Sequence, residues 1–179
     1  RDPGETHDLS GDAGACADTR QALAAWYDQS EMPPGAADAL LPGRPAIAHP
    51  LDVDFGDEVR LLSVDLPDQP VAPGASFPVT YTFEARGALA GGWKVFAHFE
   101  GSGGPRFHAD HEPPRPLAWW RAGQFIRYPR QVAVPSGTRP GRYALWVGLF
   151  RRDKRRPAAS RATPVVDDRA QVGAVEVGR

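Results

Sequence analysis

Residues 93–111, WKVFAHFEGSGGPRFHADH, decide the fold. Apolar and polar side chains alternate on both sides of a glycine-rich centre at residues 101–104. A period of two is typical of a β-strand with one buried face, and glycines supply the positive φ angles that tight hairpin turns need. The stretch therefore predicts an antiparallel hairpin in which the opposed pairs are Phe99 with Phe107, Glu100 with Arg106, and His98 with His108.

One face of this hairpin carries a candidate metal site. Directly opposed side chains have Cβ atoms about 4.5–5.5 Å apart, so His98 and His108 are close enough to share Zn²⁺ or Cu²⁺. Asp110 or Glu100 would be a third ligand. The same pairing also describes an ordinary polar sheet face that binds nothing. His111 has the opposite parity and is expected to face the core, and no other cofactor is expected.

The period of two recurs along residues 53–179. Further strands are expected at residues 58–66, 77–83, 125–134, 143–150 and 171–177, separated by turns rich in proline and glycine. Short strands at this spacing predict a mainly β fold, a two-sheet immunoglobulin-like sandwich of about seven strands.

Two of these strands carry more specific signals. Residues 143–150 are apolar on both faces and are expected in the middle of a sheet. Pro129 is expected on an edge strand, because proline cannot donate to a sheet ladder. Pro140-Gly141-Arg142-Tyr143 predicts a tyrosine corner, in which the Tyr143 hydroxyl bonds back to the preceding turn.

Residues 1–52 read as a polar arm with an extended linker. One short N-terminal helix is expected at about residues 17–28, where Leu23, Trp26 and Tyr27 form one apolar face that would pack on the sandwich. A second short helix is expected at residues 36–41.

Composition and charge narrow the functional classes. The net charge is −1, which argues against a general nucleic-acid partner. Cys16 is the single cysteine, so no internal disulfide forms. No apolar run approaches the roughly 20 residues that span a bilayer. Because the chain begins at Arg1 and is rich in arginine, alanine, glycine and proline, we expect a mature bacterial protein or fragment, attached to a membrane only through an anchor outside this sequence.

Two surface candidates lie outside the hairpin. Tryptophan and arginine side chains in a proline-rich connection suit a sugar face or a protein partner, and the set is Arg115, Trp119, Trp120 and Arg121. The plainer interpretation is that one or both tryptophans cap the open end of the sandwich. A basic patch that would meet anionic glycans or lipid head groups, or simply be a solvated loop, comprises Arg151, Arg152, Lys154, Arg155 and Arg156.

A family resemblance covers roughly residues 53–177. The segments that carry it are FGDEVRLLSVDLPDQPVAPGASFPVTYTFEA (55–85), WKVFAHFEG (93–101), HADHEPP (108–114), WRAGQFIR (120–127) and VPSGTRPGRYALWVGLFRR (134–152). In this order they resemble an Ig-like β-sandwich module found in the soluble C-terminal region of bacterial membrane glycosyltransferases and in related envelope proteins. The resemblance implies an extracytoplasmic accessory domain without catalysis, in which Trp120 is a structural plug and Trp119 is the freer ring.

These observations predict a non-catalytic binding or scaffolding module that is periplasmic, displayed on the cell surface or secreted. Its ligand would be a glycan or a partner protein. Two alternatives remain open at this point, a small metal-binding envelope protein that uses the cross-strand histidine pair, and an accessory fragment of a glycosyltransferase or hydrolase. The sequence does not predict an oligomeric state.

Overall fold

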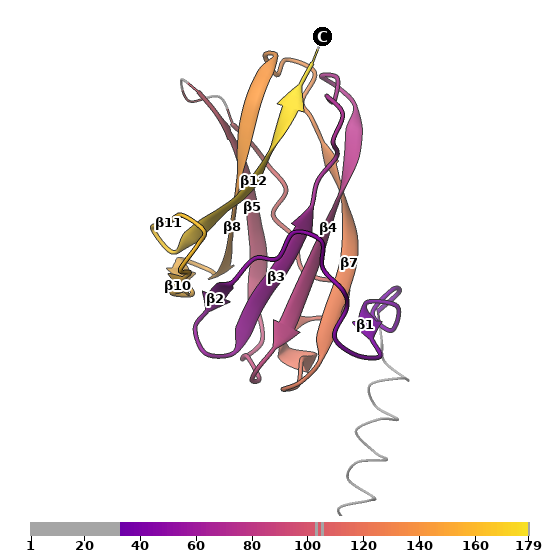
Figure 1. Ribbon diagram of the computed structural model, residues 1–179, viewed down its shortest axis with the longest axis vertical. Helices are drawn as coiled ribbons and strands as arrows, with labels where there is room; N and C mark the ends of the chain where they lie inside the picture. The colour runs from indigo at the N-terminus through magenta and orange to yellow at the C-terminus, as the bar shows by residue number, and fades with distance from the viewer. Residues whose placement is uncertain (1–32, 103, 105, 179) are drawn as a thin grey trace, which may run out of the picture. The chain divides into compact units, whose positions relative to one another are not determined.

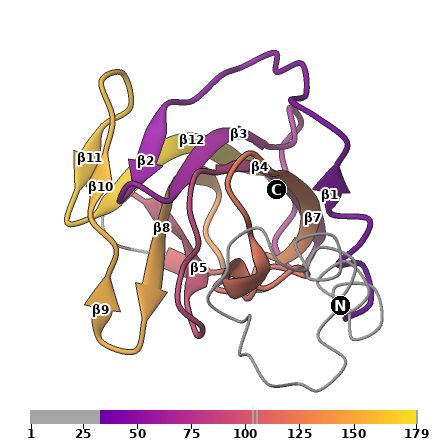
Figure 2. The ribbon, with the colours of Figure 1, turned by 90° about the horizontal axis from the view of Figure 1, so that it is seen from below.

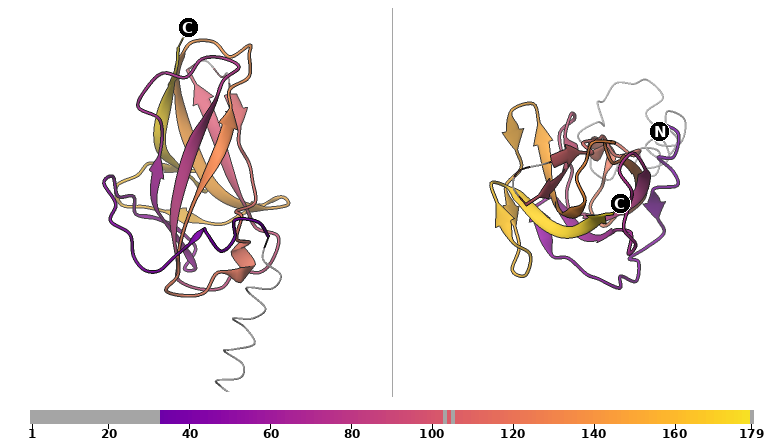
Figure 3. Two further views of the ribbon diagram at one scale, coloured as in Figure 1. Left: turned by 90° about the vertical axis from the view of Figure 1, so that its right-hand side faces the viewer. Right: turned by 90° about the horizontal axis from the view of Figure 1, so that it is seen from above.

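Two antiparallel sheets pack face to face in the computed structural model, which describes residues 33–102, 104 and 106–178 (Figure 1). The first sheet has the order β1 (Leu40–Leu41), β7 (Phe125–Ala133), β4 (Ser76–Ala85), β3 (Val59–Asp65), β2 (Val53–Phe55) and β10 (Ala158–Ala159). The second has the order β11 (Val165–Val166), β12 (Arg169–Val177), β8 (Gly141–Arg151), β5 (Lys94–Gly101) and β6 (Arg106–His108), and β9 (Lys154–Arg155) pairs with β8. The protein is therefore a β-sandwich, and Figure 3 shows its two layers on either side of a shared interior.

The seven strands expected from the sequence correspond to β3, β4, β5, β6, β7, β8 and β12. The other five strands are two or three residues long. A 3₁₀ turn, η1 (Leu117–Trp119), is the only helical element among the described residues, and none of these residues forms a helix that is long and apolar enough to span a membrane. The expected helix at residues 17–28, with Leu23, Trp26 and Tyr27, lies outside the described residues.

The expectation of a second helix at residues 36–41 is wrong. A single turn forms there, with hydrogen bonds from Ala36 N to Pro33 O and from Ala39 N to Gly35 O. The chain then straightens, because Leu40 and Leu41 pair with the start of β7 as strand β1. Pro42 follows Leu41, and a residue before proline is disfavoured in the helical conformation, so a helix cannot easily continue here.

Aromatic side chains from both sheets fill the interior. Phe77 of β4 meets Phe99 of β5 edge-on with ring centroids 5.7 Å apart, and Phe99 stacks on Phe107 of β6 at 4.6 Å. Each of these rings is at most 4% exposed. Complete burial of such a side chain stabilises the fold by about 1.5–3 kcal/mol, so the hairpin is anchored to the opposite sheet through the residues that define its register.

Strand β8 lies between β12 and β5, which confirms the central position expected from its two apolar faces. At its start the Tyr143 hydroxyl donates a 2.8 Å hydrogen bond to the Arg139 carbonyl. The expected tyrosine corner is therefore present, and it ties the turn before β8 to the first buried residue of the strand.

Strand β7 has a long exposed edge. Only its first two residues pair with β1, so from Arg127 onward its outer side has no strand neighbour among the described residues. Pro129 lies in this stretch, opposite Thr80 of β4, as expected of a proline on an edge. Arg130 follows it and has the parity of the buried Tyr128 and Val132, although Arg130 itself is exposed.

The crossover between β8 and β12, residues 152–168, contains β9, β10 and β11, which Figure 2 shows together at one side of the sandwich. Strand β10 pairs with β2 of the first sheet, and β11 pairs with β12 of the second. Side chains reinforce the crossing, since Arg156 pairs with Glu58 and the Ser160 hydroxyl donates to Asp52 at 2.5 Å. The crossover therefore connects the two sheets along one edge.

Candidate metal centre

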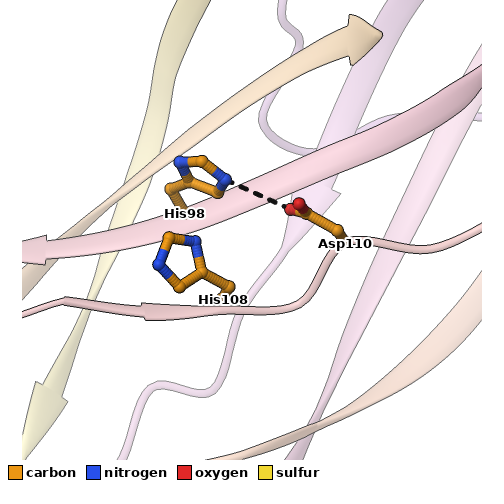
Figure 4. A group of neighbouring side chains, drawn as sticks. All are labelled: His98, His108 and Asp110. Carbon is orange, nitrogen blue, oxygen red and sulfur yellow. Dashed lines mark ion pairs between the residues drawn. The ribbon is translucent and has the colours of Figure 1, made fainter. Parts of the chain in front are cut away.

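His98 on β5 and His108 on β6 lie directly opposite each other, as the sequence predicts. Their rings meet edge to face, with centroids 4.2 Å apart and planes at 86° (Figure 4). The neighbouring pairs, Phe99 with Phe107 and Glu100 with Arg106, also have the predicted register. The glycine-rich turn therefore places the two imidazoles on the same outer face of the second sheet.

Asp110 is held beside this pair by an irregularity in the hairpin ladder. Strand β6 ends at His108, and the Ala97 N–H donates to the Asp110 Oδ1 atom at 3.0 Å. The Ala109 carbonyl, which faces Ala97, instead accepts a hydrogen bond from the His111 Nδ1 atom at 2.8 Å. The Asp110 carboxylate thus takes the place of a backbone acceptor in the ladder, and the hydrogen bond from Ala97 orients it.

The three side chains converge on one point of the surface. The Asp110 Oδ1 atom is 3.3 Å from His98 Nε2, and the ligand atoms of His98, His108 and Asp110 all lie within 4.8 Å of one another. A tetrahedral ion with Zn–N bonds of about 2.0–2.1 Å holds its donors roughly 3.3 Å apart. One pair already has this spacing, and His108 is exposed, so its ring can turn toward the other two.

The protonation of His98 also suits a metal ligand. Burial is the largest influence and holds the pKa of His98 below its ordinary value, although the Asp110 carboxylate acts in the opposite direction. Metal ions bind the neutral imidazole. A histidine that stays neutral at physiological pH loses no affinity to proton competition there.

His111 does not join this group. Its side chain is buried, at 6% exposure, and its Nε2 atom lies 3.0 Å from the hydroxyl of Tyr128 on β7. Because Nδ1 donates to the Ala109 carbonyl, Nε2 accepts from the Tyr128 hydroxyl. The expected core orientation of His111 is confirmed, and the residue connects the two sheets in the interior.

The expected ligand surface around residues 115–121 is largely internal. Trp120 is fully buried, and its indole Nε1 donates to the Arg115 carbonyl at 2.8 Å. The Arg115 side chain is only 2% exposed, which leaves the half-buried Trp119 and the exposed Arg121 at the surface. Arg121 donates to two carbonyls of its own loop. The plug interpretation of Trp120 agrees with this burial.

The arginines of the basic patch, residues 151–156, stack on two different aromatic rings. Arg151 and Arg156 lie over the Trp93 ring, with guanidinium carbons 5.2 and 5.9 Å from its centroid. Arg155 lies over Phe96 at 5.1 Å. Arg152 and Lys154 are exposed at the turn between β8 and β9. The patch is therefore a β-hairpin with three stacked guanidinium groups, in which Arg152, Lys154 and Arg155 remain exposed to solvent.

One ion pair near the trio was not predicted. The Glu100 carboxylate accepts a hydrogen bond from Arg169 of β12, and the Arg169 guanidinium lies 4.7 Å from the centroid of Trp146 on β8. The hairpin pattern predicts Glu100 opposite Arg106, and this register is present, but the carboxylate bonds to Arg169. The contact with Arg169 depends on the order of β12, β8 and β5 in the sheet, for which the sequence carries no local signal.

No family model and no curated protein sequence matches this chain. The interpretation of function therefore depends on the geometry of the described residues.

Proposed function

We propose that this chain is a non-catalytic binding module with an Ig-like fold, and that His98, His108 and Asp110 bind a divalent transition metal, Zn²⁺ or Cu²⁺. The observation that carries the proposal is the convergence of the three ligand atoms within 4.8 Å, with the carboxylate fixed by the Ala97 N–H. Nitrogen and carboxylate donors in this number are typical of both ions.

The strand order supports the Ig-like assignment. The chain places β3 and β4 in the first sheet, crosses to β5 and β6 in the second, returns for β7, and ends with β8 and β12 in the second. Ig-like sandwiches alternate between their sheets in this way and carry a tyrosine corner at the start of the penultimate strand, where Tyr143 lies. We propose accordingly that the chain serves outside the cytoplasm, as an accessory module of the kind seen in membrane glycosyltransferases and envelope proteins.

Thermal unfolding with added Zn²⁺ or Cu²⁺ tests the metal function, on protein purified without a nickel column and treated with chelator. At a free ion concentration of about 100 times Kd, binding stabilises the fold by about 2.7 kcal/mol, which corresponds to a rise in Tm of about 5–10 °C for a chain of this size. His108→Ala removes an exposed ligand and should abolish the shift. The matched control is His49→Ala, since His49 is also exposed but is not part of the trio. An unchanged Tm with both ions would refute the proposal. Loss of the metal-induced Tm shift in the His49 variant, to the same extent as in the His108 variant, would refute it too.

A glycan or partner protein is a second candidate ligand, favoured by the two residues that the 115–121 segment keeps at the surface. Trp119 offers part of an aromatic face, and Arg121 lies exposed beside it. A polysaccharide pull-down with wild-type protein and Trp119→Ala tests this candidate. Equal retention of both proteins would exclude Trp119 as the contact.

A further inference from the structure

A hollow of about 240 Å³ opens directly beside the metal trio. His98 and Asp110 line it together with residues 152–155, which form the turn after β8 and strand β9. The hollow is several times larger than the roughly 30 Å³ that one water molecule occupies in the liquid. It therefore has room for a small polar group that touches both the trio and the turn.

Two aromatic rings, Phe96 and Phe150, also line the hollow. The Phe96 ring centroid lies 4.9 Å from that of His98 and 6.3 Å from that of Phe150. Arg155 is fixed over Phe96 at 5.1 Å, and its Nη1 atom donates to the Asp167 carbonyl at 2.8 Å. One cation is thus held in place over the ring that adjoins a metal ligand.

A second cation, Arg152, lines the hollow from the turn between β8 and β9. Arg152 has a φ of 57°, in the left-handed region that glycine adopts without penalty and other residues seldom adopt. Because Arg151 pairs with Lys154, Arg152 is the first residue of a two-residue hairpin turn, a position that needs a positive φ. The exposed Lys154 lies two residues further along and lines the same hollow.

The charges in the hollow favour an anion once a metal is bound. Three cations, Arg152, Lys154 and Arg155, face two carboxylates, Asp110 and Asp153. Metal-bound imidazoles are neutral, so a divalent ion adds two positive charges that no further side chain of the hollow balances. The trio supplies three ligands, whereas Zn²⁺ takes four, so one coordination position remains for an outside oxygen.

We propose that the metal-loaded trio binds an oxyanion, a phosphoryl or carboxylate group, in this hollow. One oxygen of the group completes the coordination of the metal, and the cations of the β8–β9 turn neutralise the rest of its charge. This inference rests on the metal function proposed above. Phosphate esters and acidic sugars both present such a group, and they differ in charge and in shape.

Isothermal titration separates these sources. Zn²⁺-loaded protein, freed of excess ion by desalting, is titrated in one arm with phenyl phosphate and in the other with glucuronate. We expect at least one of them to bind, and to bind at least tenfold more weakly to chelator-treated protein. The compound that binds more tightly identifies the class of ligand.

Arg152→Gly tests the role of the turn. Glycine adopts a positive φ without penalty, so Tm should stay the same or rise. Loss of the cation should weaken anion binding roughly tenfold, which is the effect of one charge-assisted hydrogen bond. Arg142→Gln removes the same charge from the opposite end of β8 and should leave the affinity unchanged.

The experiments distinguish a missing oxyanion site from a missing metal site. If Zn²⁺ raises Tm but neither anion binds, or if the anion binds chelated protein equally well, the oxyanion site is refuted and the metal function stands. Equal loss of affinity in the Arg142 and Arg152 variants would show a diffuse charge effect and would also refute the site. If Zn²⁺ itself does not bind, both proposals fall.

Discussion

Two buried tyrosines of this protein should respond in opposite ways to the same substitution. Tyr81 is fully buried and Tyr143 is 2% exposed. The Tyr143 hydroxyl donates to the Arg139 carbonyl at 2.8 Å, whereas the Tyr81 hydroxyl has no hydrogen-bonding partner among the described residues. Replacement by phenylalanine removes one oxygen in each case and keeps the ring.

The expected magnitudes follow from this difference. A satisfied hydrogen bond contributes about 0.5–1.5 kcal/mol net, and a buried polar group without a partner costs about 1–3 kcal/mol. Tyr143→Phe should therefore lower the free energy of unfolding by about 1 kcal/mol, and Tyr81→Phe should raise it by about 1 kcal/mol or more. The ring of Tyr81 keeps its stacking on Tyr128, whose centroid is 5.6 Å away, so no packing is lost.

Equilibrium urea unfolding, followed by far-UV circular dichroism, measures both variants against the parent. Equal m-values would show that the substitutions change stability and leave the extent of unfolding unchanged. Tyr128→Phe is a third member of the series, since it removes the bond to the His111 Nε2 atom and should also destabilise. If Tyr81→Phe destabilises as much as Tyr143→Phe, the Tyr81 hydroxyl is satisfied and the reasoning is wrong.

Three further predictions concern other parts of the sandwich. Burial holds the pKa of both His98 and His111 below the ordinary value of 6.5. Just below about pH 6.5 the two histidines become protonated in the unfolded chain but stay neutral in the folded one. The free energy of unfolding is therefore highest above about pH 6.5. At lower pH it falls by at most about 1.4 kcal/mol per pH unit for each histidine. Urea unfolding in EDTA between about pH 5 and pH 8 should show this slope, and a flat profile would contradict it. Gly148→Ala should destabilise by about 1–3 kcal/mol, because a Cβ there overlaps the Phe96 ring, and thermal melts check it. Trp120→Ala leaves a cavity beside Phe83 and should cost about 3–5 kcal/mol in the same assay, where a loss below 1 kcal/mol would argue against the plug.

Local signals made the hairpin predictable. The glycine-rich turn fixes where the chain reverses, and the alternation of side chains on either side then fixes every opposed pair from His98 to Arg106. The position of Tyr143 followed in the same way, from a turn directly before a strongly apolar strand. In both cases the determining residues lie within about ten positions of one another in the sequence.

Contacts between distant segments were not predictable from the same evidence. The ion pair of Glu100 with Arg169 spans 69 positions and depends on which strands are neighbours in the second sheet. The role of Asp110 in the ladder was also missed, because a side chain replaces a backbone acceptor there and breaks the regular pattern on which the prediction relied. Residues 151–156 were predicted as one basic patch from their charge alone. In the structure their arginines stack on two different aromatic rings, Trp93 and Phe96, which lie elsewhere in the sequence.

The exposed edge of β7 has a consequence for how copies of this module behave when crowded together. A foreign strand that added to this edge would meet Pro129, which offers no N–H, and then Arg130, whose inward parity would force a guanidinium to shed water. Prolines and inward-pointing charges are devices by which natural sheets resist edge-to-edge aggregation. We therefore expect the sandwich to remain dispersed at high local concentration, such as display in many copies on a surface would impose.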